Sequence, residues 1–278
     1  MELTSASARE RYHDLAANLS RSVIGLDFDG VLAPIVADPA AAHIHPGAAE
    51  VLLELAGQAL AVAVITGRPA RQALALGGLD EIGAAVAEIG SELHLYGQYG
   101  NERWSSTNRR IVSPRPPRGL STFLRELPRL VRESDAVGAH IEEKGLAVAV
   151  HTRLLPDPDA ARDRLVPVLR QAAARHDLAV EPGRAVVEVR SPGMHKGKAV
   201  RTIVAELDAQ GFLFAGDDLG DLEAFHAVAE LRESGLTTLL VCSASDEQSA
   251  LIPLADVVVP GPDGVLDLLR RLTADARG

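Results

Sequence analysis

Short runs of consecutive apolar residues recur in both outer parts of the chain, and stretches with helical spacing separate them. The runs show little polar alternation, which is typical of strands that are buried on both faces. We expect such strands at residues 22–27, 60–66, 84–89, 211–214, 237–242 and 256–259. Helical spacing indicates helices at 45–59, 198–207, 219–230 and 265–272. This order predicts an α/β fold with a doubly wound parallel sheet, of the Rossmann-like type.

The pattern changes in the middle of the chain. A proline-rich stretch at 113–119 is followed by helical spacing, two short alternating strands, a long helix and two more strands. Helix, hairpin, helix and hairpin form a small α+β layer that differs from the flanking segments. We therefore expect a core made of residues 1–106 and 193–278, with an inserted α+β domain at 107–192.

Composition excludes several classes of partner. The 278 residues carry a net charge of −10, and 47% are hydrophobic, so we expect a folded protein that binds neither nucleic acid nor an anionic membrane. The single cysteine, Cys242, allows no intrachain disulfide, which fits a reducing compartment. No signal-peptide pattern or membrane-length apolar run is visible, and we expect a cytoplasmic location.

Acidic residues follow two of the expected strands. Asp27 and Asp29 end the first, and Asp217, Asp218 and Asp221 follow the strand at 211–214. Carboxylates at the end of a buried strand are costly unless a cation meets them. Ligands of open α/β sheets bind beyond the carboxyl ends of the strands. The two groups therefore predict one acidic cleft.

These residue types suit phosphoryl transfer. A carboxylate such as Asp27 can attack phosphorus and form an aspartyl phosphate, and a second acid two residues on can donate and later accept a proton. Mg²⁺ suits a site made of oxygen ligands and would offset the charge. Thr66-Gly67-Arg68 opens a helix, so its hydroxyl and amides can hold phosphate oxygens, and Lys196 offers a positive charge. Each motif alone is common in turns, helix caps or solvated loops, but their combination and order favour a catalytic site.

The same motifs carry a family resemblance. Asp27-Phe-Asp-Gly-Val, Thr66-Gly-Arg, Lys196-Gly and Gly216-Asp-Asp-Leu-Gly-Asp221 resemble the four motifs of the haloacid dehalogenase superfamily, in its phosphatase branch. The inserted domain lies between the second and third motifs, as in the larger cap type of that superfamily. Further segments are similar to the trehalose-6-phosphate phosphatase family: 27–35, 97–102, 142–146, 151–153, 188–190 and 216–225.

This resemblance implies roles for the acidic residues. Asp27 would be the nucleophile and Asp29 the acid/base. Asp27, the backbone carbonyl of Asp29, and Asp217 would hold Mg²⁺, with Asp218 and Asp221 close by. Thr66, Gly67 and Lys196 would bind the phosphate.

In the inserted domain, Glu142, Lys144 and Glu188 match positions that the family uses for sugar hydroxyls. A disaccharide offers only hydroxyls, so charged donors and acceptors aimed at them are a reasonable means of recognition. The alternatives are a set of solvated strand charges or an ion pair inside the cap.

The resemblance implies an Mg²⁺-dependent phosphatase that releases trehalose from trehalose 6-phosphate, the last step of trehalose biosynthesis. A second hypothesis is a phosphatase with the same core that acts on sucrose phosphate or glucosylglycerol phosphate. A third is a silenced homologue that binds a sugar phosphate or a synthase partner. Asp27, Asp29, Lys196 and Asp217 are all present, which argues against the third. Association with a trehalose-phosphate synthase stays open.

Overall fold

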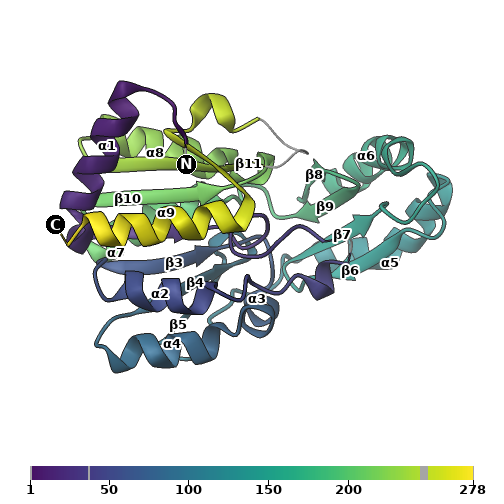
Figure 1. Cartoon of the computed structure of the whole chain (residues 1–278). Helices are drawn as coiled ribbons and strands as arrows, with labels where there is room; N and C mark the ends of the chain where they lie inside the picture. Colours follow the sequence, from purple (N-terminus) through teal and green to yellow (C-terminus); the bar gives the residue numbers. More distant parts are fainter. Residues whose placement is uncertain (1, 37, 245–249, 278) are drawn as a thin grey trace. The chain divides into compact units, whose positions relative to one another are not determined.

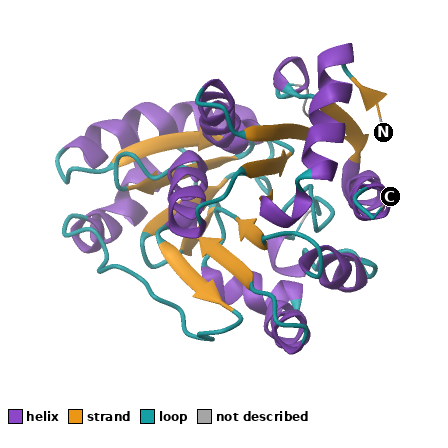
Figure 2. Cartoon of the chain, turned by 90° about the vertical axis from the view of Figure 1, so that its left-hand side faces the viewer, coloured by secondary structure: helices purple, strands orange, loops and turns teal. Residues whose placement is uncertain are grey.

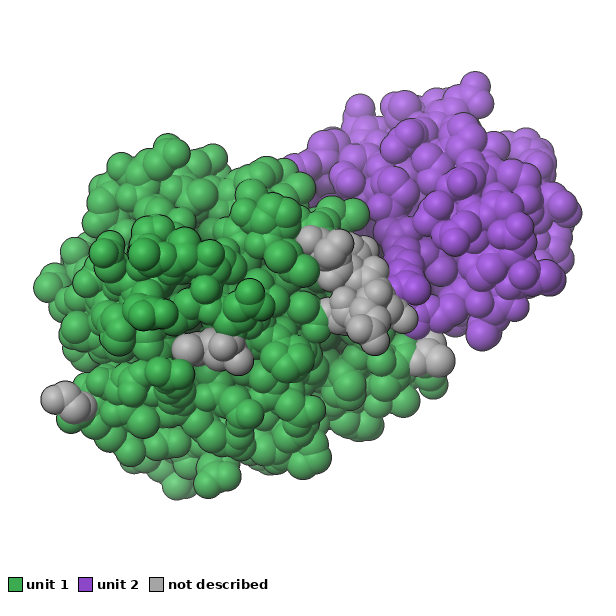
Figure 3. All heavy atoms as spheres, turned by 45° about the horizontal axis from the view of Figure 1, so that its top comes forward, with its two compact units in different colours: residues 1–113, 195–278 green, residues 114–194 purple. Residues whose placement is uncertain are grey.

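The computed structural model describes residues 2–36, 38–244 and 250–277, and the chain divides into two compact units. Unit 1 comprises Met1–Ser113 and His195–Gly278, and unit 2 comprises Pro114–Met194. Figure 3 colours the two units separately. Unit 2 covers nearly the same residues as the inserted domain expected at 107–192.

Unit 1 is built on a mixed but mostly parallel sheet, as the apolar runs predict. Inner strands pair in parallel, whereas β1 and β5 pair antiparallel with their neighbours. In spatial order the strands are β1 (Glu2–Leu3), β12 (Val257–Pro260), β11 (Thr237–Ala244), β10 (Gly211–Gly216), β2 (Ser22–Leu26), β3 (Ala61–Ile65), β4 (Leu93–Gly97) and β5 (Glu102–Ser105).

Helices cover both faces of this sheet (Figure 1), which confirms the doubly wound arrangement. One face packs against α1 (Ala6–Ala17), α2 (Ala48–Ala56), α3 (Ala70–Gly77), α4 (Leu79–Glu88) and α9 (Gly261–Asp275). The other face packs against α7 (Lys196–Leu207) and α8 (Leu222–Glu233). Short 3₁₀ turns, η1 to η5, lie at Leu19–Arg21, Pro39–Ala41, Gln98–Gly100, Leu219–Asp221 and Ile252–Leu254.

The prediction of a strand at 84–89 is wrong. These residues lie in α4, where Ile82 and Val86 face the core one helical turn apart. The strand instead follows at Leu93–Gly97, where polar and apolar residues alternate. A short alanine-rich apolar run does not distinguish a strand from a buried helix, and alanine favours the helix.

Unit 2 is a layer of two helices on an antiparallel sheet (Figure 2 marks helices and strands by colour). The helices pack on one face of the sheet through apolar residues such as Phe123, Val148, Leu165 and Val187. The strand order is β6 (His140–Glu143), β7 (Ala147–His151), β9 (Val186–Arg190) and β8 (Ala179–Gly183), and the helices are α5 (Leu120–Glu133) and α6 (Pro158–Ala174). The expected sequence of helix, hairpin, helix and hairpin is therefore confirmed.

The first residues of the chain are tied to the edge of the core sheet. Strand β1 pairs with β12, and the amide of Thr4 donates to the carbonyl oxygen of Asp256 at 3.0 Å. Arg11 of α1 and Arg232 of α8 both donate to the buried Asp256 carboxylate, which also accepts from the amide of Leu240. No helix in the described part of the chain is long and apolar enough to cross a membrane.

Candidate active site

Three neighbouring strands deliver the central residues of the site. Asp27 follows β2, Thr66 follows β3 and Asp217 follows β10, and these strands lie side by side in the order β10, β2, β3. Register fixes the ends at similar heights, because Leu26 pairs with both Ala215 and Val64. The strand ends therefore converge at one edge of the sheet, as the sequence predicts.

Glycine permits the closest approach between two of these strand ends. Gly30 has a φ of +71°, and a Cβ atom built there would lie 2.3 Å from Oδ2 of Asp217. The residue must therefore lack a side chain for both conformational and steric reasons. Ser243, at the end of β11, donates a hydrogen bond of 2.6 Å to the carbonyl oxygen of Gly30 and helps to hold this turn.

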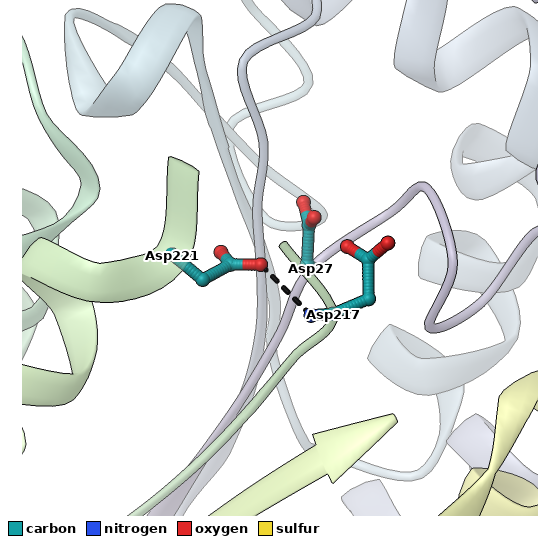
Figure 4. Close-up of side chains that lie close together, drawn as sticks. All are labelled: Asp27, Asp217 and Asp221. Atoms are coloured by element: carbon teal, nitrogen blue, oxygen red, sulfur yellow. Dashed lines mark hydrogen bonds between the residues drawn. The ribbon is translucent and has the colours of Figure 1, made fainter. Parts of the chain in front are cut away.

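Three carboxylates gather at this edge (Figure 4). Asp27, Asp217 and Asp221 each offer one oxygen, and these oxygens all lie within 4.8 Å of one another. Asp221 also shapes the loop, because its Oδ2 accepts a hydrogen bond of 3.0 Å from the amide of Asp217. All three residues are buried.

Lys196 meets two of these acids. It is the first residue of α7, and its Nζ lies 2.7 Å from Oδ1 of Asp27 and 2.7 Å from Oδ1 of Asp221. Burial acts to lower the pKa of Lys196, but attraction to Asp221 and Asp27 outweighs it and raises the pKa above its usual range. The lysine is therefore charged.

The acids themselves are held at an energetic cost. Burial raises the pKa of Asp27 well above its usual range, and repulsion from Asp221 adds to this effect while Lys196 opposes it. Burial, followed by repulsion from Asp27, raises the pKa of Asp217 to about 10. In the absence of a cation, this cluster therefore favours bound protons.

The residues present fit a hard divalent cation. The cluster offers only carboxylate oxygens, and three ionised aspartates with one lysine leave a net charge of −3 + 1 = −2. A divalent cation would balance this charge, and Mg²⁺ prefers oxygen donors. Asp218 lies outside the cluster: its side chain is exposed, and its Oδ1 accepts from the amide of Gly220 at 2.8 Å.

Asp29 is held by the side chain of Arg68, to which the sequence pattern assigned no role beyond the backbone amides of Thr66-Gly-Arg. Arg68 donates to both carboxylate oxygens of Asp29, from Nε at 2.7 Å and from Nη2 at 2.6 Å. Its third nitrogen, Nη1, donates to the carbonyl oxygen of Pro39, and the guanidinium lies over the ring of Phe28. The only available signal was its place as the third residue of Thr66-Gly-Arg.

The Thr66–Arg68 loop is ordered by its own hydrogen bonds. Thr66 is buried, and its Oγ1 accepts from the amide of Arg68 at 3.1 Å. The amide of Thr66 donates to the carbonyl oxygen of Tyr96 on the neighbouring strand. The loop leads into α3, whose amino end favours a bound anion.

The three residues expected to contact sugar lie in unit 2, on the sheet face away from α5 and α6. Glu142 pairs in register with Ala149, and Ala149 pairs with Glu188, so both glutamates lie on the same face. Lys144 Nζ lies 2.7 Å from Oε2 of Glu188. The ion pair that the sequence left as an alternative is therefore present.

Both glutamates have further partners within unit 2. Arg190 Nη1 lies 2.9 Å from Oε1 of Glu188, and His151 Nε2 lies 2.9 Å from Oε2 of Glu142. Glu181 lies opposite Glu188 in the register of β8 and β9, and Nη2 of Arg190 lies 3.9 Å from Oε1 of Glu181. Three acids, Glu142, Glu181 and Glu188, therefore share this face with two bases, Lys144 and Arg190.

Comparison with known proteins identifies one family and several similar sequences. Residues 25–257 match the model of the family described as trehalose-phosphatase. An uncharacterized glycosyl hydrolase of Mycobacterium tuberculosis is 36% identical over 219 residues, which cover 75% of this chain and 15% of that protein. The trehalose-phosphate phosphatase of Mycolicibacterium paratuberculosis is 33% identical over 212 residues, which cover 73% of this chain and 50% of that protein. The chain thus spans half or less of the length of these relatives.

Solved structures agree on the fold. The carboxyl-terminal domain of trehalose-6-phosphate phosphatase from Candida albicans has a TM-score of 0.77 at 20% identity and covers 98% of both chains. The carboxyl-terminal domain of a trehalose synthase regulatory protein from the same organism has a TM-score of 0.70 at 15% identity, covering 97% of this chain and 99% of that one. Because the family model spans most of the sequence, the chain belongs to the trehalose-phosphatase family.

Proposed function

We propose that this protein hydrolyses trehalose 6-phosphate to trehalose and phosphate, with Mg²⁺ as its cofactor. The observation that carries the proposal is the buried group of Asp27, Asp217, Asp221 and Lys196 in a chain of the trehalose-phosphatase family. The substrate is a sugar phosphate, and trehalose 6-phosphate is the member of that class that the family indicates.

In the first step Asp27 is the nucleophile. A carboxylate oxygen of Asp27 attacks phosphorus, a new oxygen–phosphorus bond forms, and the bond from phosphorus to the sugar oxygen breaks. Asp29 gives a proton to the leaving sugar oxygen, so trehalose departs as a neutral alcohol. The products of this step are trehalose and an aspartyl phosphate on Asp27.

In the second step Asp29 works as a base. It takes a proton from a water molecule, whose oxygen attacks the phosphorus of the aspartyl phosphate. The bond between phosphorus and the Asp27 oxygen breaks, which releases inorganic phosphate and restores the carboxylate. Arg68 donates one hydrogen bond to each Asp29 oxygen, which leaves a second lone pair on each oxygen for the proton that is transferred.

Binding of the phosphate falls to Thr66, Gly67 and Lys196. Thr66 and Gly67 precede the amino end of α3, and Lys196 supplies a positive charge beside the nucleophile. Asp27, Asp217 and Asp221 offer the oxygens that would hold Mg²⁺, together with the Asp29 carbonyl that the family resemblance implies. When bound, the cation would offset the negative charge of the nucleophile and of the phosphate.

Sugar recognition falls to unit 2. Glu142 and Glu188 offer acceptors to sugar hydroxyl groups, and Lys144 offers a donor. Lys144 and Glu188 form an ion pair and Glu142 contacts His151, so these partners hold the three side chains on one face of the sheet.

The test is phosphate release with Mg²⁺ from trehalose 6-phosphate, sucrose 6-phosphate, glucose 6-phosphate and p-nitrophenyl phosphate. We expect strong preference for trehalose 6-phosphate, and no release in EDTA or with Asp27→Asn. Activity spread evenly over the sugars would retain the core chemistry and refute the roles of the unit 2 residues. No release from any substrate would refute the phosphatase and favour a binding role, as in a regulatory protein.

A further inference from the structure

The segment 97–102 lies against the phosphate-binding loop. The amide of Gln98 donates to the carbonyl oxygen of Arg68 at 2.8 Å, and the amide of Tyr99 donates to the carbonyl oxygen of Thr66 at 2.9 Å. Two residues of the loop are therefore fixed through their backbone oxygens. Both Gln98 and Tyr99 have positive φ angles, 44° and 60°, which non-glycine residues adopt only where the surroundings require it.

The side chain of Glu102, from the same segment, caps the helix that follows the loop. Helix α3 has no side-chain cap of its own at Pro69, but the carboxylate of Glu102 accepts a hydrogen bond of 2.6 Å from the amide of Ala70. A carboxylate there satisfies an open backbone donor and is favoured by the helix dipole. Glu102 is itself fixed in β5, and its Oε1 lies 3.3 Å from the hydroxyl oxygen of Ser113.

The other side of the segment packs on the helix that carries the phosphate-binding lysine. Gly100 has a φ of +89°, and a Cβ atom built there would lie 2.6 Å from Cβ of Ala199, in the first turn of α7. A Cβ atom built on Gly67 would lie 2.9 Å from the ring of Tyr99. One segment therefore touches both the Thr66–Arg68 loop and the helix that begins at Lys196.

We propose that the 97–102 segment positions the two phosphate-binding elements and that Glu102 is the positioning residue for the Thr66–Ala70 loop. Its carboxylate accepts a hydrogen bond from the amide of Ala70 and so fixes the first turn of α3. The proposal rests on the phosphatase function of this site and adds a residue that does not touch the reacting atoms. Loss of this carboxylate loosens the loop, so that Thr66 and Gly67 hold phosphate less well.

The experiment measures the dissociation constant of inorganic phosphate by titration calorimetry, with Mg²⁺ and the full chain. Glu102→Ala removes the acceptor, and Glu102→Gln keeps an acceptor oxygen of the same reach. Asp157→Ala is the matched control, because Asp157 also caps a helix with its carboxylate, accepting from Ala160 at 3.0 Å, but lies in unit 2. All measurements are made well below each variant's melting temperature.

We expect phosphate to bind about tenfold more weakly to Glu102→Ala, by analogy with the lower end of what loss of a supporting hydrogen bond costs around metal ligands. Glu102→Gln should stay within about threefold of the wild type, and so should Asp157→Ala. Equal affinity of Glu102→Ala and the wild type, or tighter binding by the variant, would overturn the proposal. Equal weakening by Glu102→Gln would overturn the hydrogen-bond argument, and this variant serves as the test if Glu102→Ala does not fold.

The same experiment separates this inference from the phosphatase function. If the wild type hydrolyses trehalose 6-phosphate and Glu102→Ala binds phosphate as tightly as the wild type, the positioning role alone is refuted. Phosphate binding that depends on Glu102, without hydrolysis of any sugar phosphate, refutes the phosphatase alone. Wild-type protein that binds no phosphate and hydrolyses no sugar phosphate refutes both.

Discussion

Asp217→Asn should stabilise the metal-free protein while it impairs the metal site. The pKa of Asp217 is raised to about 10 by burial and by the neighbouring acids, above an ordinary value of 3.8. At neutral pH the folded protein must therefore bind a proton that the unfolded chain does not hold. An asparagine of almost the same shape removes this requirement.

The size of the effect follows from the two pKa values. At pH 7 the unfavourable proton uptake spans 7 − 3.8, or about 3 pH units, and at 1.36 kcal/mol per unit the cost to folding is at most about 4 kcal/mol. Asp27 and Asp221 share this repulsion, so we expect about half, roughly 2 kcal/mol. For a domain of this size that gain raises the melting temperature by roughly 4–8 °C.

The assay is thermal unfolding in EDTA and in Mg²⁺, at several pH values. Because the pKa of Asp217 is raised in the folded protein, the contribution of this group to wild-type stability falls as pH increases above about 4, and the variant's advantage should grow from about pH 5 to about pH 9. When the Mg²⁺ concentration is 100 times the dissociation constant, the free energy of unfolding of the wild type should rise by about 2.7 kcal/mol. That of the variant should rise much less. The exposed Asp267→Asn is the control and should change little in either buffer.

A lower melting temperature for Asp217→Asn in EDTA would refute this reasoning. So would an advantage that does not change with pH, since the stabilisation must follow the titration of the carboxyl group. Equal response of wild type and variant to Mg²⁺ would remove Asp217 from the metal site.

Three further changes test other parts of the molecule. Arg68→Lys should lower kcat/KM for trehalose 6-phosphate roughly tenfold and kcat/KM for p-nitrophenyl phosphate less, because this ratio reports the first step, in which the better leaving group needs no proton from Asp29; equal losses in kcat/KM would contradict this. Glu188→Gln should raise KM for trehalose 6-phosphate roughly tenfold without changing that for p-nitrophenyl phosphate, and an unchanged KM for both would remove it from sugar binding. Asp256→Ala should lower the free energy of unfolding in urea by about 3 kcal/mol, because Arg11 and a buried amide lose their acceptor; a loss below about 1 kcal/mol would contradict the estimate.

Much of the core could be predicted from the sequence because ligands of a parallel sheet bind beyond the carboxyl ends of its strands, so polar residues at those ends indicate a site. Asp27, Thr66 and Asp217 were expected at such ends, and the register of β10, β2 and β3 brings those ends together. The run at 84–89 misled because its composition fits either kind of buried element, and only tertiary packing decides between them.

The partners of the site residues were harder to foresee. The hydrogen bonds from Arg68 to Asp29 join residues 39 positions apart, and that from Ser243 to Gly30 joins residues 213 apart. No periodicity specifies such contacts, because they depend on how loops from different strands meet. In unit 2, the ion pair between Lys144 and Glu188 joins residues 44 positions apart and likewise depends on how the segments meet in space.

The pairing of β1 with β12 has a consequence for the behaviour of the protein in concentrated solution. Strand β12 contains three consecutive valines, and β1 occupies its outer backbone groups at Val257 and Val258. A valine-rich strand with open hydrogen-bonding groups is a template for pairing with another molecule. We therefore expect the short strand Glu2–Leu3 to prevent β12 from pairing with a strand of another molecule. Removal of β1 should make the protein prone to self-association.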